Sequence, residues 1–474
     1  PIDKISVALT IPFPFQSISI QNFSHQMTIL DNNNAEDYTV ALLRSLQFSG
    51  VRFIRYFALD ACGTIRCKAT PIEVVLAKKT LQNQVSVAAV CMAGLPTYAD
   101  IMIAGTGMDA KNVLKLQPDI SSLRILPYAP KTTMIMAYAV DQYTNIISPL
   151  CTRGLLKRVV EEAAQKHNTA FSIGAELEFC LLHAKTKDPV DYSIFASTIT
   201  LNEQESFIVE LCDQLRQQDI PVELIHAESG PGQLEVVLQY SNDPLVMADN
   251  IVLCRETIRA VAQQFGLQAM FTPKYDMMAA GNGMHLHFST RDASTGQPNF
   301  CNGNSLTDRG GSFLEGILSH LPALLGLTLP TVNSFRRVGP GCWTGSALGW
   351  ATEDKECGVR VCSDLATCEW RHFELKFIDH TCNIYLAMAA ILFAGSQGIE
   401  KSMTLCEPLH KDPSPTPLPS SVFEALDALE KDASLVSFLG PPLTQAYLAV
   451  RRHDAERAST MAFSDEVKDL LRRC

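Results

Sequence analysis

Two glutamates set two residues apart inside an otherwise apolar run constrain this chain more than any other feature. Glu176 and Glu178 lie in a segment that predicts a buried strand. Residues i and i+2 of a strand project from the same face, so the two carboxylates lie side by side. Their repulsion is tolerable only with full solvation or with a cation between them. A solvated strand edge would explain the pair alone, but burial is favoured by the flanking residues Phe171, Ile173, Phe179, Cys180, Leu181 and Leu182.

More residues of the same chemical kind follow along the chain. They are Glu228, Glu235, His285, His287 and Glu374. The two histidines share a strand face and come after a glycine-rich segment, where backbone can approach a ligand closely. A single histidine would more often be a structural residue. Carboxylates combined with imidazole suit hard divalent cations, so we expect Mg²⁺ or Mn²⁺.

Basic residues gather in the same third of the chain. They are Arg336, Arg337, Lys355, Arg360, Arg371 and Lys376. Each one alone is equally consistent with an ordinary solvated surface. Together with the acidic and imidazole candidates, however, they form the set that phosphoryl transfer requires, with cations for phosphate oxygens and metal ligands for bridging phosphates. The sequence therefore predicts a metal-dependent enzyme that handles phosphate.

Composition excludes several other classes of protein. The 474 residues carry a net charge of −11, which argues against nucleic acid as a partner, because phosphate backbones are held by clustered Lys and Arg. Fifteen scattered cysteines without a Cys-x-x-Cys pair indicate reduced thiols rather than a disulfide framework. The longest apolar helical run, Tyr385–Ala394, is too short to span a membrane. We expect a cytoplasmic protein with no membrane partner.

The pattern along the chain predicts three segments. They are an N-terminal extension at residues 1–34, a small mixed domain at 35–145 and a larger domain at 146–474. Strands are predicted in the small domain at residues 51–60, 64–70 and 132–140, after a helix at 35–46. In the larger domain we predict helices from Thr152, as N-cap, to His167, from Asp243-Pro244 to Phe265, and at Gly311–Leu327, Asn383–Gln397 and Ser420–Lys431. A proline-rich surface loop is predicted at Pro408–Pro419.

Spaced motifs give residues 50–470 a resemblance to class I glutamine synthetase. They occur in the family's order, as Gly174-Ala-Glu-Leu-Glu-Phe179, Glu228 to Glu235, Phe271-Thr-Pro-Lys274, Gly283-Met-His-Leu-His287, Asn333-Ser-Phe-Arg-Arg337 and Asn383-Ile-Tyr-Leu386. Two further motifs, Trp343-Thr-Gly345 and Phe373-Glu-Leu-Lys376, look most like the FluG-type branch of that family.

The resemblance implies an α+β fold. The small domain would be a β-grasp domain, and the large α/β catalytic domain would contain a curved antiparallel sheet that forms a funnel. Active sites in this family lie between neighbouring subunits of a ring. The chain is therefore expected to form a homo-oligomer, a dodecamer or a similar ring.

The resemblance also implies roles for individual residues. Glu178, Glu228 and Glu235 would hold one metal, and Glu176, His285 and Glu374 a second metal that bridges the phosphates of ATP. His287, Arg360 and Lys355 would contact ATP, and Ser289 would lie near the nucleotide. Arg337 would bind the carboxylate of glutamate, with Lys376 beside it, and the backbone at Gly281 would meet the amino group.

The chain departs from the family pattern where ammonium would react. The flap glutamate of the family, which takes a proton from ammonium, falls on Trp343, and an indole cannot act as a general base. The acidic residues that complete the ammonium pocket also lack clear counterparts. Lys355 and Lys376 stand where arginines are usual, and Ala280 replaces an asparagine.

Three interpretations follow. In the first, the enzyme activates a glutamate-like carboxylate as an acyl phosphate and joins it to an organic amine rather than ammonium, with Trp343 as a wall for the amine. In the second, the chain is a catalytically inactive regulator or scaffold. In the third, it is a metal-dependent hydrolase that needs no ATP, which would leave His287 and Arg360 without a task. The first is preferred, because drift in an inactive protein would erode the six metal ligands too.

Overall fold

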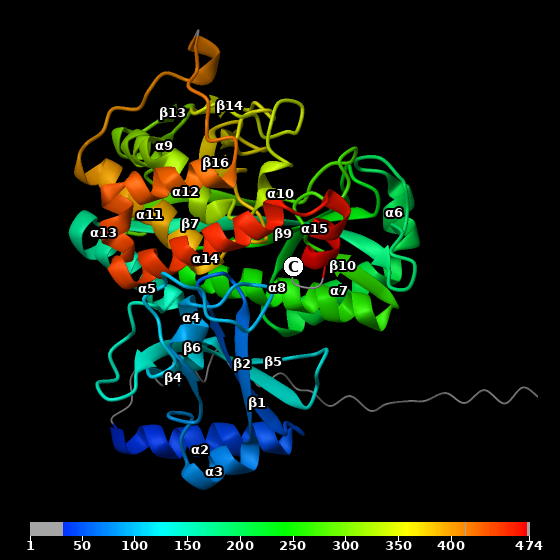
Figure 1. Ribbon diagram of the computed structural model, residues 1–474, viewed down its shortest axis with the longest axis vertical. Helices are drawn as coiled ribbons and strands as arrows, with labels where there is room; N and C mark the ends of the chain where they lie inside the picture. Colours follow the sequence, from blue (N-terminus) through cyan, green and yellow to red (C-terminus); the bar gives the residue numbers. More distant parts are fainter. Residues whose placement is uncertain (1–31, 413, 472–474) are drawn as a thin grey trace, which may run out of the picture.

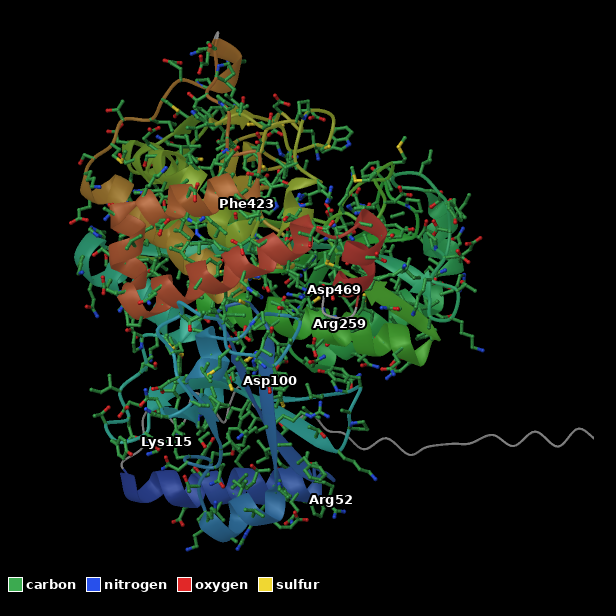
Figure 2. All side chains as sticks on the ribbon, viewed as in Figure 1. Arg52, Asp100, Lys115, Arg259, Phe423 and Asp469 are labelled. Carbon is green, nitrogen blue, oxygen red and sulfur yellow. The ribbon has the colours of Figure 1, made fainter. Side chains whose placement is uncertain are left out.

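The computed structural model describes residues 32–412 and 414–471. Most of the predicted N-terminal extension lies outside these residues. The first described helix, α2 (Asn32–Phe48), begins before the predicted start at residue 35. Figure 1 shows a small unit of sheet and helices at one end of the molecule and a larger unit at the other. In Figure 2, Arg52 and Lys115 mark the small unit and Phe423 marks a helical layer of the large one.

The small unit is a curled six-stranded sheet in the order β2-β1-β6-β4-β3, with β5 beside β6. The strands are β1 (Phe53–Leu59), β2 (Ile65–Pro71), β3 (Ser86–Ala88), β4 (Val113–Pro118), β5 (Arg124–Ile125) and β6 (Thr132–Asp141). The central pair, β1 and β6, is parallel, whereas β1 and β2 form an antiparallel hairpin. The three predicted strands of this unit are confirmed. Its helical pieces are α2, α3 (Ile72–Lys78), α4 (Val90–Ala93) and η1 (Ile120–Ser122).

The large unit is built on an eight-stranded sheet in the order β14-β15-β16-β11-β7-β9-β8, with β10 beside β7. The strands are β7 (Thr169–His183), β8 (Val222–Ala227), β9 (Gln233–Ser241), β10 (Leu267–Met270), β11 (Met284–Asp292), β14 (Ala351–Thr352), β15 (Val359–Ser363) and β16 (Trp370–Leu375), with a separate small hairpin of β12 (Cys301–Asn302) and β13 (Ser305–Leu306). The predicted α+β fold is confirmed. One detail of the expected antiparallel sheet is wrong, because the edge strands β14 and β15 run parallel.

Strand β7 shows how the sequence separates the two faces of this sheet. Phe171, Ile173, Ala175, Leu177 and Phe179 are each no more than 1% exposed and point into the core. The residues between them face the other way, since side chains alternate along a strand. On the core side, the ring of Phe171 packs 5.8 Å from that of Phe313, centroid to centroid. The opposite face is therefore free to carry polar side chains.

The rest of the large unit consists mainly of helices. They are α5 (Thr152–His167), α6 (Thr198–Glu203), α7 (Glu205–Gln217), α8 (Pro244–Gln264), α9 (Asp308–Thr328), α10 (Val332–Phe335), α11 (Ile384–Glu400), α12 (Val422–Lys431), α13 (Ala433–Leu439), α14 (Pro441–Ser459) and α15 (Phe463–Leu470). The largely buried α11 packs against α9 and α5. None of the helices in residues 32–412 and 414–471 combines the length and the apolar character that crossing a membrane requires.

The predicted helices are found within a few residues of their expected limits, and one cap is corrected. Asp243 caps α8 by accepting hydrogen bonds from the N–H groups of Leu245 and Val246. Thr152 was predicted as the N-cap of α5, but it is the first helical residue, and the Sγ of Cys151 accepts from the N–H of Gly154 instead. The predicted proline-rich loop contains, in its described residues, the single turn η2 (Leu409–Lys411) and an isolated bridge from Pro417 to Ala347.

Charged side chains join the two units at a buried network. Arg153 on α5 lies 2.9 Å from a carboxylate oxygen of Asp119 in the small unit and 2.8 Å from one of Asp249 on α8. The hydroxyl of Tyr385 donates to the other oxygen of Asp249 at 2.6 Å. Burial alone would raise the pKa of Asp119, but attraction to Arg153 and hydrogen bonds from Ser121 outweigh it and lower the pKa.

Candidate active site

Strand register places the predicted ligands opposite one another on the polar face of the large sheet. From β15 to β9, the paired residues are Arg360 with Glu374, Glu374 with His287, His285 with Glu176, and Glu178 with Glu235. Directly opposed residues of neighbouring strands have their Cβ atoms about 5 Å apart. Glu228 follows the end of β8, in the turn that leads to β9. We call these residues the carboxylate row.

His285 lies at the centre of the carboxylate row. Its Nδ1 is 3.2 Å from Glu176 Oε2 and 3.3 Å from Glu374 Oε1. Its Nε2 is 3.7 Å from Glu178 Oε1. The structure therefore brings His285, Glu176 and Glu374, predicted to share one metal, into direct contact.

His287 extends this cluster, since its Nε2 is 3.0 Å from Glu176 Oε1. Burial alone would lower the pKa of His287, but the charges of Glu176 and Glu374 and hydrogen bonds with Cys362 and Glu176 together outweigh burial and raise the pKa well above its ordinary value. Burial would likewise raise the pKa of Glu176, yet His287 and His285 hold that pKa well below the usual range. In the absence of a metal ion, the imidazoles and carboxylates of this cluster thus favour each other's charged forms.

Glu178 is held by the segment that precedes β11. The N–H of Gly283 donates to Glu178 Oε2 at 2.6 Å. Gln233 Nε2 donates to the carbonyl of Gly281 and to Asn282 Oδ1, both at 2.9 Å. A side chain at Gly281 would place its Cβ 2.5 Å from the carbonyl oxygen of Pro273, so only glycine allows this backbone approach. The predicted substrate loop is therefore anchored next to the carboxylate row.

His226 is a member of the site that the sequence reasoning missed. Its Nε2 lies 3.0 Å from Glu235 Oε1 and its Nδ1 lies 3.8 Å from Glu228 Oε1. The hydrogen bond with Glu235 raises the pKa of His226 to about 9, against the opposing effect of burial. Burial raises the pKa of Glu235, and the neighbouring Glu176 and Glu178 add to this, while His226 lowers it. The signal was available, because His226 and Glu228 have the same two-residue spacing as Glu176 and Glu178.

The donors of the carboxylate row fit a hard divalent cation. The ligand atoms of Glu176, Glu235 and His285 all lie within 4.8 Å of one another, as do those of Glu176, His287 and Glu374 and those of His226, Glu228 and Glu235. Carboxylate oxygens with few imidazoles are the ligands that Mg²⁺ and Mn²⁺ accept. Buried carboxylates this close require positive charge between them, which the cation would provide.

The predicted basic residues have different surroundings. Arg360 Nε donates to Glu374 Oε2 at 2.7 Å, so it lies on the carboxylate row itself. Arg337 is 4% exposed and donates to the main-chain oxygens of Lys376 and Ile378. Lys376 Nζ donates to the main-chain oxygens of Trp343 at 2.9 Å and Lys355 at 2.6 Å. Arg337 and Lys376 thus hold backbone in place, beside the strand that carries Glu374.

Two predicted residues stand at the margin of the site. The side chain of Lys355 is exposed. The hydroxyl of Ser289 donates to the main-chain oxygen of Arg371 at 3.1 Å, on the same face of β11 as His285 and His287.

Trp343 lies in a loop whose backbone is tightly held although its side chain is open to solvent. The residue has φ 59° and is 57% exposed. Its N–H donates to Glu356 Oε1 at 3.2 Å, and the N–H of Gly341 donates to Glu356 Oε2 at 3.2 Å. An exposed indole on a fixed backbone can cover an apolar group without itself exchanging a proton.

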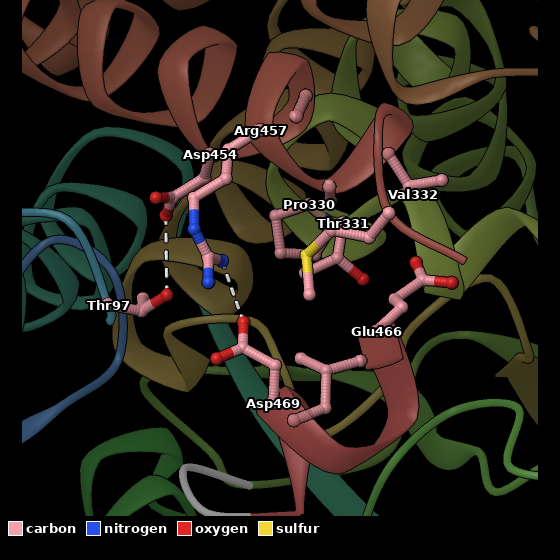
Figure 3. Close-up of a pocket in the computed structure, with 12 residues that line it drawn as sticks. Thr97, Pro330, Thr331, Val332, Asp454, Arg457, Glu466 and Asp469 are labelled. Carbon is pink, nitrogen blue, oxygen red and sulfur yellow. Dashed lines mark hydrogen bonds and ion pairs between the residues drawn. The ribbon is translucent and has the colours of Figure 1, made fainter. Parts of the chain in front are cut away.

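A separate pocket shares no lining residue with the carboxylate row. It lies where helices α14 and α15 meet Thr97 of the small unit, as Figure 3 shows. Arg457 and Asp469 are paired across it at 2.7 Å. Arg457 also stacks over the ring of Tyr98, 4.0 Å from its centroid. These contacts fasten the C-terminal helices to the small unit, and nothing in the lining points to the phosphate chemistry of the row.

Comparison with known proteins decides the family. Residues 149–469 match the family described as glutamine synthetase, catalytic domain. The chain belongs to the glutamine synthetase family. The match begins before α5 and ends within α15, so the carboxylate row, Trp343 and Lys376 all lie inside it. Membership makes the chain a glutamine synthetase-family ATP-dependent ligase.

Relatives in this family carry different activities in their names. The chain is 29% identical over 455 residues to type-1 glutamine synthetase 1 of Dictyostelium discoideum, covering 89% of each protein. It is 30% identical over 441 residues to gamma-glutamylpolyamine synthetase GlnA3 of Streptomyces coelicolor, covering 88% of this chain and 92% of that protein. A solved GmaS/ADP complex superposes with a TM-score of 0.78 at 26% identity, covering 89% of this chain and 97% of the other. The acceptor of this glutamine synthetase-family chain must therefore be argued from its own residues.

Proposed function

We propose that this chain activates the carboxylate of glutamate, or a related amino acid, as an acyl phosphate and joins it to an organic amine. The observation that carries the proposal is a contrast within one site. The carboxylate row is complete and assembled, whereas the position expected to carry the proton-accepting glutamate holds the exposed indole of Trp343. The residues needed to activate the carboxylate are therefore present, and the glutamate needed to deprotonate ammonium is absent.

The reaction proceeds in two balanced steps. The terminal phosphoryl group of ATP passes to an oxygen of the substrate carboxylate, and its bond to ADP breaks. The amine nitrogen then attacks the acyl carbon, phosphate leaves with its oxygen, and the nitrogen loses one proton. When bound, divalent cations on the carboxylate row would offset the negative charge of the phosphates. The residues that would hold one ion are Glu176, His285 and Glu374, which are in contact. For the other ion we assign the set that the family resemblance implies, Glu178, Glu228 and Glu235, of which Glu178 and Glu235 are register partners.

Arg360 and His287 are placed to bind phosphate beside this row. Each already contacts a carboxylate of the row, Arg360 at 2.7 Å from Glu374 and His287 at 3.0 Å from Glu176. Arg360 is positively charged, and the carboxylates favour the protonated form of His287. Both side chains therefore suit phosphate oxygens. A hydrolase without ATP would leave this pair unused.

The acceptor is argued from Trp343. The carbon skeleton of an organic amine gains from an aromatic surface. A relative of 30% identity is named a gamma-glutamylpolyamine synthetase, which supports an organic amine as the class of acceptor. Ammonium offers no apolar surface for an indole to cover.

A panel of acceptors tests the proposal. Purified chain with Mg²⁺, ATP and glutamate would be offered ammonium, hydroxylamine, simple monoamines, diamines and polyamines, with phosphate release and the mass of the amide product as readouts. We expect at least one organic amine to exceed ammonium by about tenfold or more, since its carbon skeleton gains contact with the indole that ammonium cannot make. Glu178→Gln should abolish turnover, while the exposed Glu223→Gln on β8 should not.

Two other outcomes have definite meanings. Ammonium as the preferred acceptor would show that the organic-amine assignment is wrong. ATP binding without phosphate release across the whole panel would favour the second candidate, a non-catalytic regulator or scaffold, for which the absence of a carboxylate at position 343 is the supporting observation.

Three further features belong to this proposal. We infer a ring homo-oligomer, a dodecamer or similar, because sites of this kind are shared between subunits, and mass photometry of the purified chain tests it. We also infer a place in the FluG-type branch, which rests on Trp343-Thr-Gly345 and Phe373-Glu-Leu-Lys376, and a cytoplasmic location, which rests on the unpaired cysteines. The domain limits at residues 34 and 145 remain proposals as well.

A further inference from the structure

A second group of metal-ligating side chains lies next to the carboxylate row, and its chemistry is different. His287, Cys362 and His372 come from β11, β15 and β16. One nitrogen of each histidine and the Sγ of Cys362 all lie within 4.8 Å of one another. We propose that these three residues, called the thiol site below, bind one borderline-soft divalent transition-metal ion, with Zn²⁺ as its probe.

The fold itself builds the thiol site. Cys362 and His372 are register partners on adjacent antiparallel strands. The imidazole rings of His287 and His372 meet edge to face, with centroids 4.8 Å apart. All three side chains lie on the polar face of the sheet, because they alternate with the core residues Val361 and Phe373, each 0% exposed. The three ligands are thus brought together by rigid strands rather than by a mobile loop.

The distances suit a tetrahedral ion. Zinc bonds are about 2.0–2.1 Å to nitrogen and about 2.3 Å to sulfur, which places neighbouring ligand atoms about 3.3–3.7 Å apart. Ligand atoms already within 4.8 Å reach that spacing by small side-chain rotations. Three protein ligands leave a fourth position open for water or an anion. The site therefore needs no rearrangement of the backbone.

Ligand chemistry separates the thiol site from the carboxylate row. Thiolate and imidazole select ions such as Zn²⁺, whereas carboxylates select Mg²⁺ and Mn²⁺. Cys362 is 6% exposed, and its thiol now donates weakly to the main-chain oxygen of Arg360 at 3.5 Å. Binding would replace the thiol proton by the metal and release that proton to solvent, with no change of oxidation state.

Occupation of the thiol site would compete with catalysis. This part of the inference rests on the proposed function, in which His287 contacts the phosphates of ATP. An ion held by His287 would take that imidazole away from the nucleotide, and it would stand beside Arg360, two residues from Cys362. Zinc would then inhibit ATP use while Mg²⁺ supports it.

Metal binding is measured first, on full-length protein freed of metal and then given excess Mg²⁺ to occupy the carboxylate row. Co²⁺ serves as a coloured probe. We expect a thiolate-to-cobalt absorption in the near ultraviolet that one equivalent of Zn²⁺ removes. Cys362→Ser should lose the absorption, and His372→Asn should weaken Zn²⁺ binding by about tenfold or more. Cys67→Ser, an exposed thiol in the small sheet, is the matched control and should change neither.

The cobalt absorption of the wild-type protein tests the site even if a variant fails to fold. Absence of the cobalt absorption in the wild type, or its persistence in folded Cys362→Ser, would overturn the site.

Inhibition is measured second, as phosphate release in the presence of Mg²⁺ and increasing Zn²⁺. We expect Cys362→Ser to keep its activity without Zn²⁺ and to need about tenfold more Zn²⁺ for half-inhibition. Equal inhibition of the variant and the wild type would overturn the competition. If the chain released no phosphate with any amine, the proposed function would fail, while the cobalt spectrum would still decide the thiol site.

Discussion

Lys376 Nζ donates to the main-chain oxygen of Trp343 at 2.9 Å, and this bond ties the end of strand β16 to the loop that carries Trp343. The same ammonium group donates to the main-chain oxygen of Lys355 at 2.6 Å. Glu374 is two residues away on the same strand. The position of the indole and the position of a metal-binding carboxylate are therefore coupled through a single buried cation.

Replacing this cation tests the coupling. Lys376→Met would leave the two main-chain oxygens without their charged donor, and bonds to charged groups contribute about 1.5–3 kcal/mol each. We expect the free energy of unfolding to fall by about 3 kcal/mol or more and amide exchange to speed up in residues 338–345. Lys376→Arg, which retains a donor, should keep most of the stability. Unchanged exchange in the methionine variant would show that Lys376 does not position the loop.

Trp343 can be tested by restoring an acid. Trp343→Glu places a possible proton acceptor where the family has one, so we expect ammonium use, measured as kcat/KM, to rise by about tenfold or more. Trp343→Phe keeps an aromatic surface and should retain the preference for organic amines. No gain for ammonium in the glutamate variant would mean that position 343 alone does not set the acceptor.

His226 is expected to position Glu235 rather than to react. The 3.0 Å contact fixes the carboxylate, and loss of such supporting contacts typically weakens metal binding by about 10-fold to 100-fold. We predict this for His226→Asn, measured as the Mg²⁺ concentration that half-maximally raises the melting temperature. The exposed His183→Asn at the end of β7 should behave as wild type. Equal Mg²⁺ dependence of both variants would contradict a positioning role.

The interface between the two units predicts a dependence of stability on pH. The folded-state pKa of Asp119 is lowered from its ordinary 3.8, so its pairing with Arg153 stabilises the protein above that value. This contribution is lost as the pH falls through the lower folded-state pKa. Asp119→Asn should therefore cost about 1–2 kcal/mol at neutral pH, measured by denaturant unfolding, because Arg153 keeps Asp249.

The difference between wild type and Asp119→Asn should shrink below about pH 4, where the aspartate becomes protonated in both states. Asp213→Asn, which removes an exposed ion pair with Arg216, should change stability by less than about 1 kcal/mol at any pH. A constant difference down to the lowest pH that keeps the protein folded would argue against the ion pair as its source.

Periodicity made much of the site predictable. Residues two apart in a strand share a face, and this predicted that Glu176 lies beside Glu178 and His285 beside His287. Both predictions are confirmed. Helix signals such as Asp243-Pro244 predicted α8 to within one residue at either end. These features are local, because the direction of a side chain along a strand or helix follows from its neighbours in sequence.

Local signals failed where a choice between similar neighbours was needed. Thr152 looked like a cap, yet the chain turns one residue earlier and Cys151 takes that place. The two-residue spacing of His226 and Glu228 marks a shared strand face, but it does not say that Glu235 of the neighbouring strand lies opposite His226. The hydrogen bonds of Arg337 and Lys376 to main-chain oxygens could not be foreseen either, because they join segments far apart in sequence, while the predicted contacts of both residues with substrate stay predictions.

By itself, the sequence determined which residues share a face and what chemistry they offer, since strand alternation and ligand type are properties of the chain alone. Only the tertiary structure decided which residues meet. The register of β15, β16, β11, β7 and β9 brings His285 between Glu176 and Glu374, and joins Cys362 to His372 and His287. Register depends on pairing between strands that are far apart in sequence, and a shift of one residue would send every one of these side chains to the opposite face.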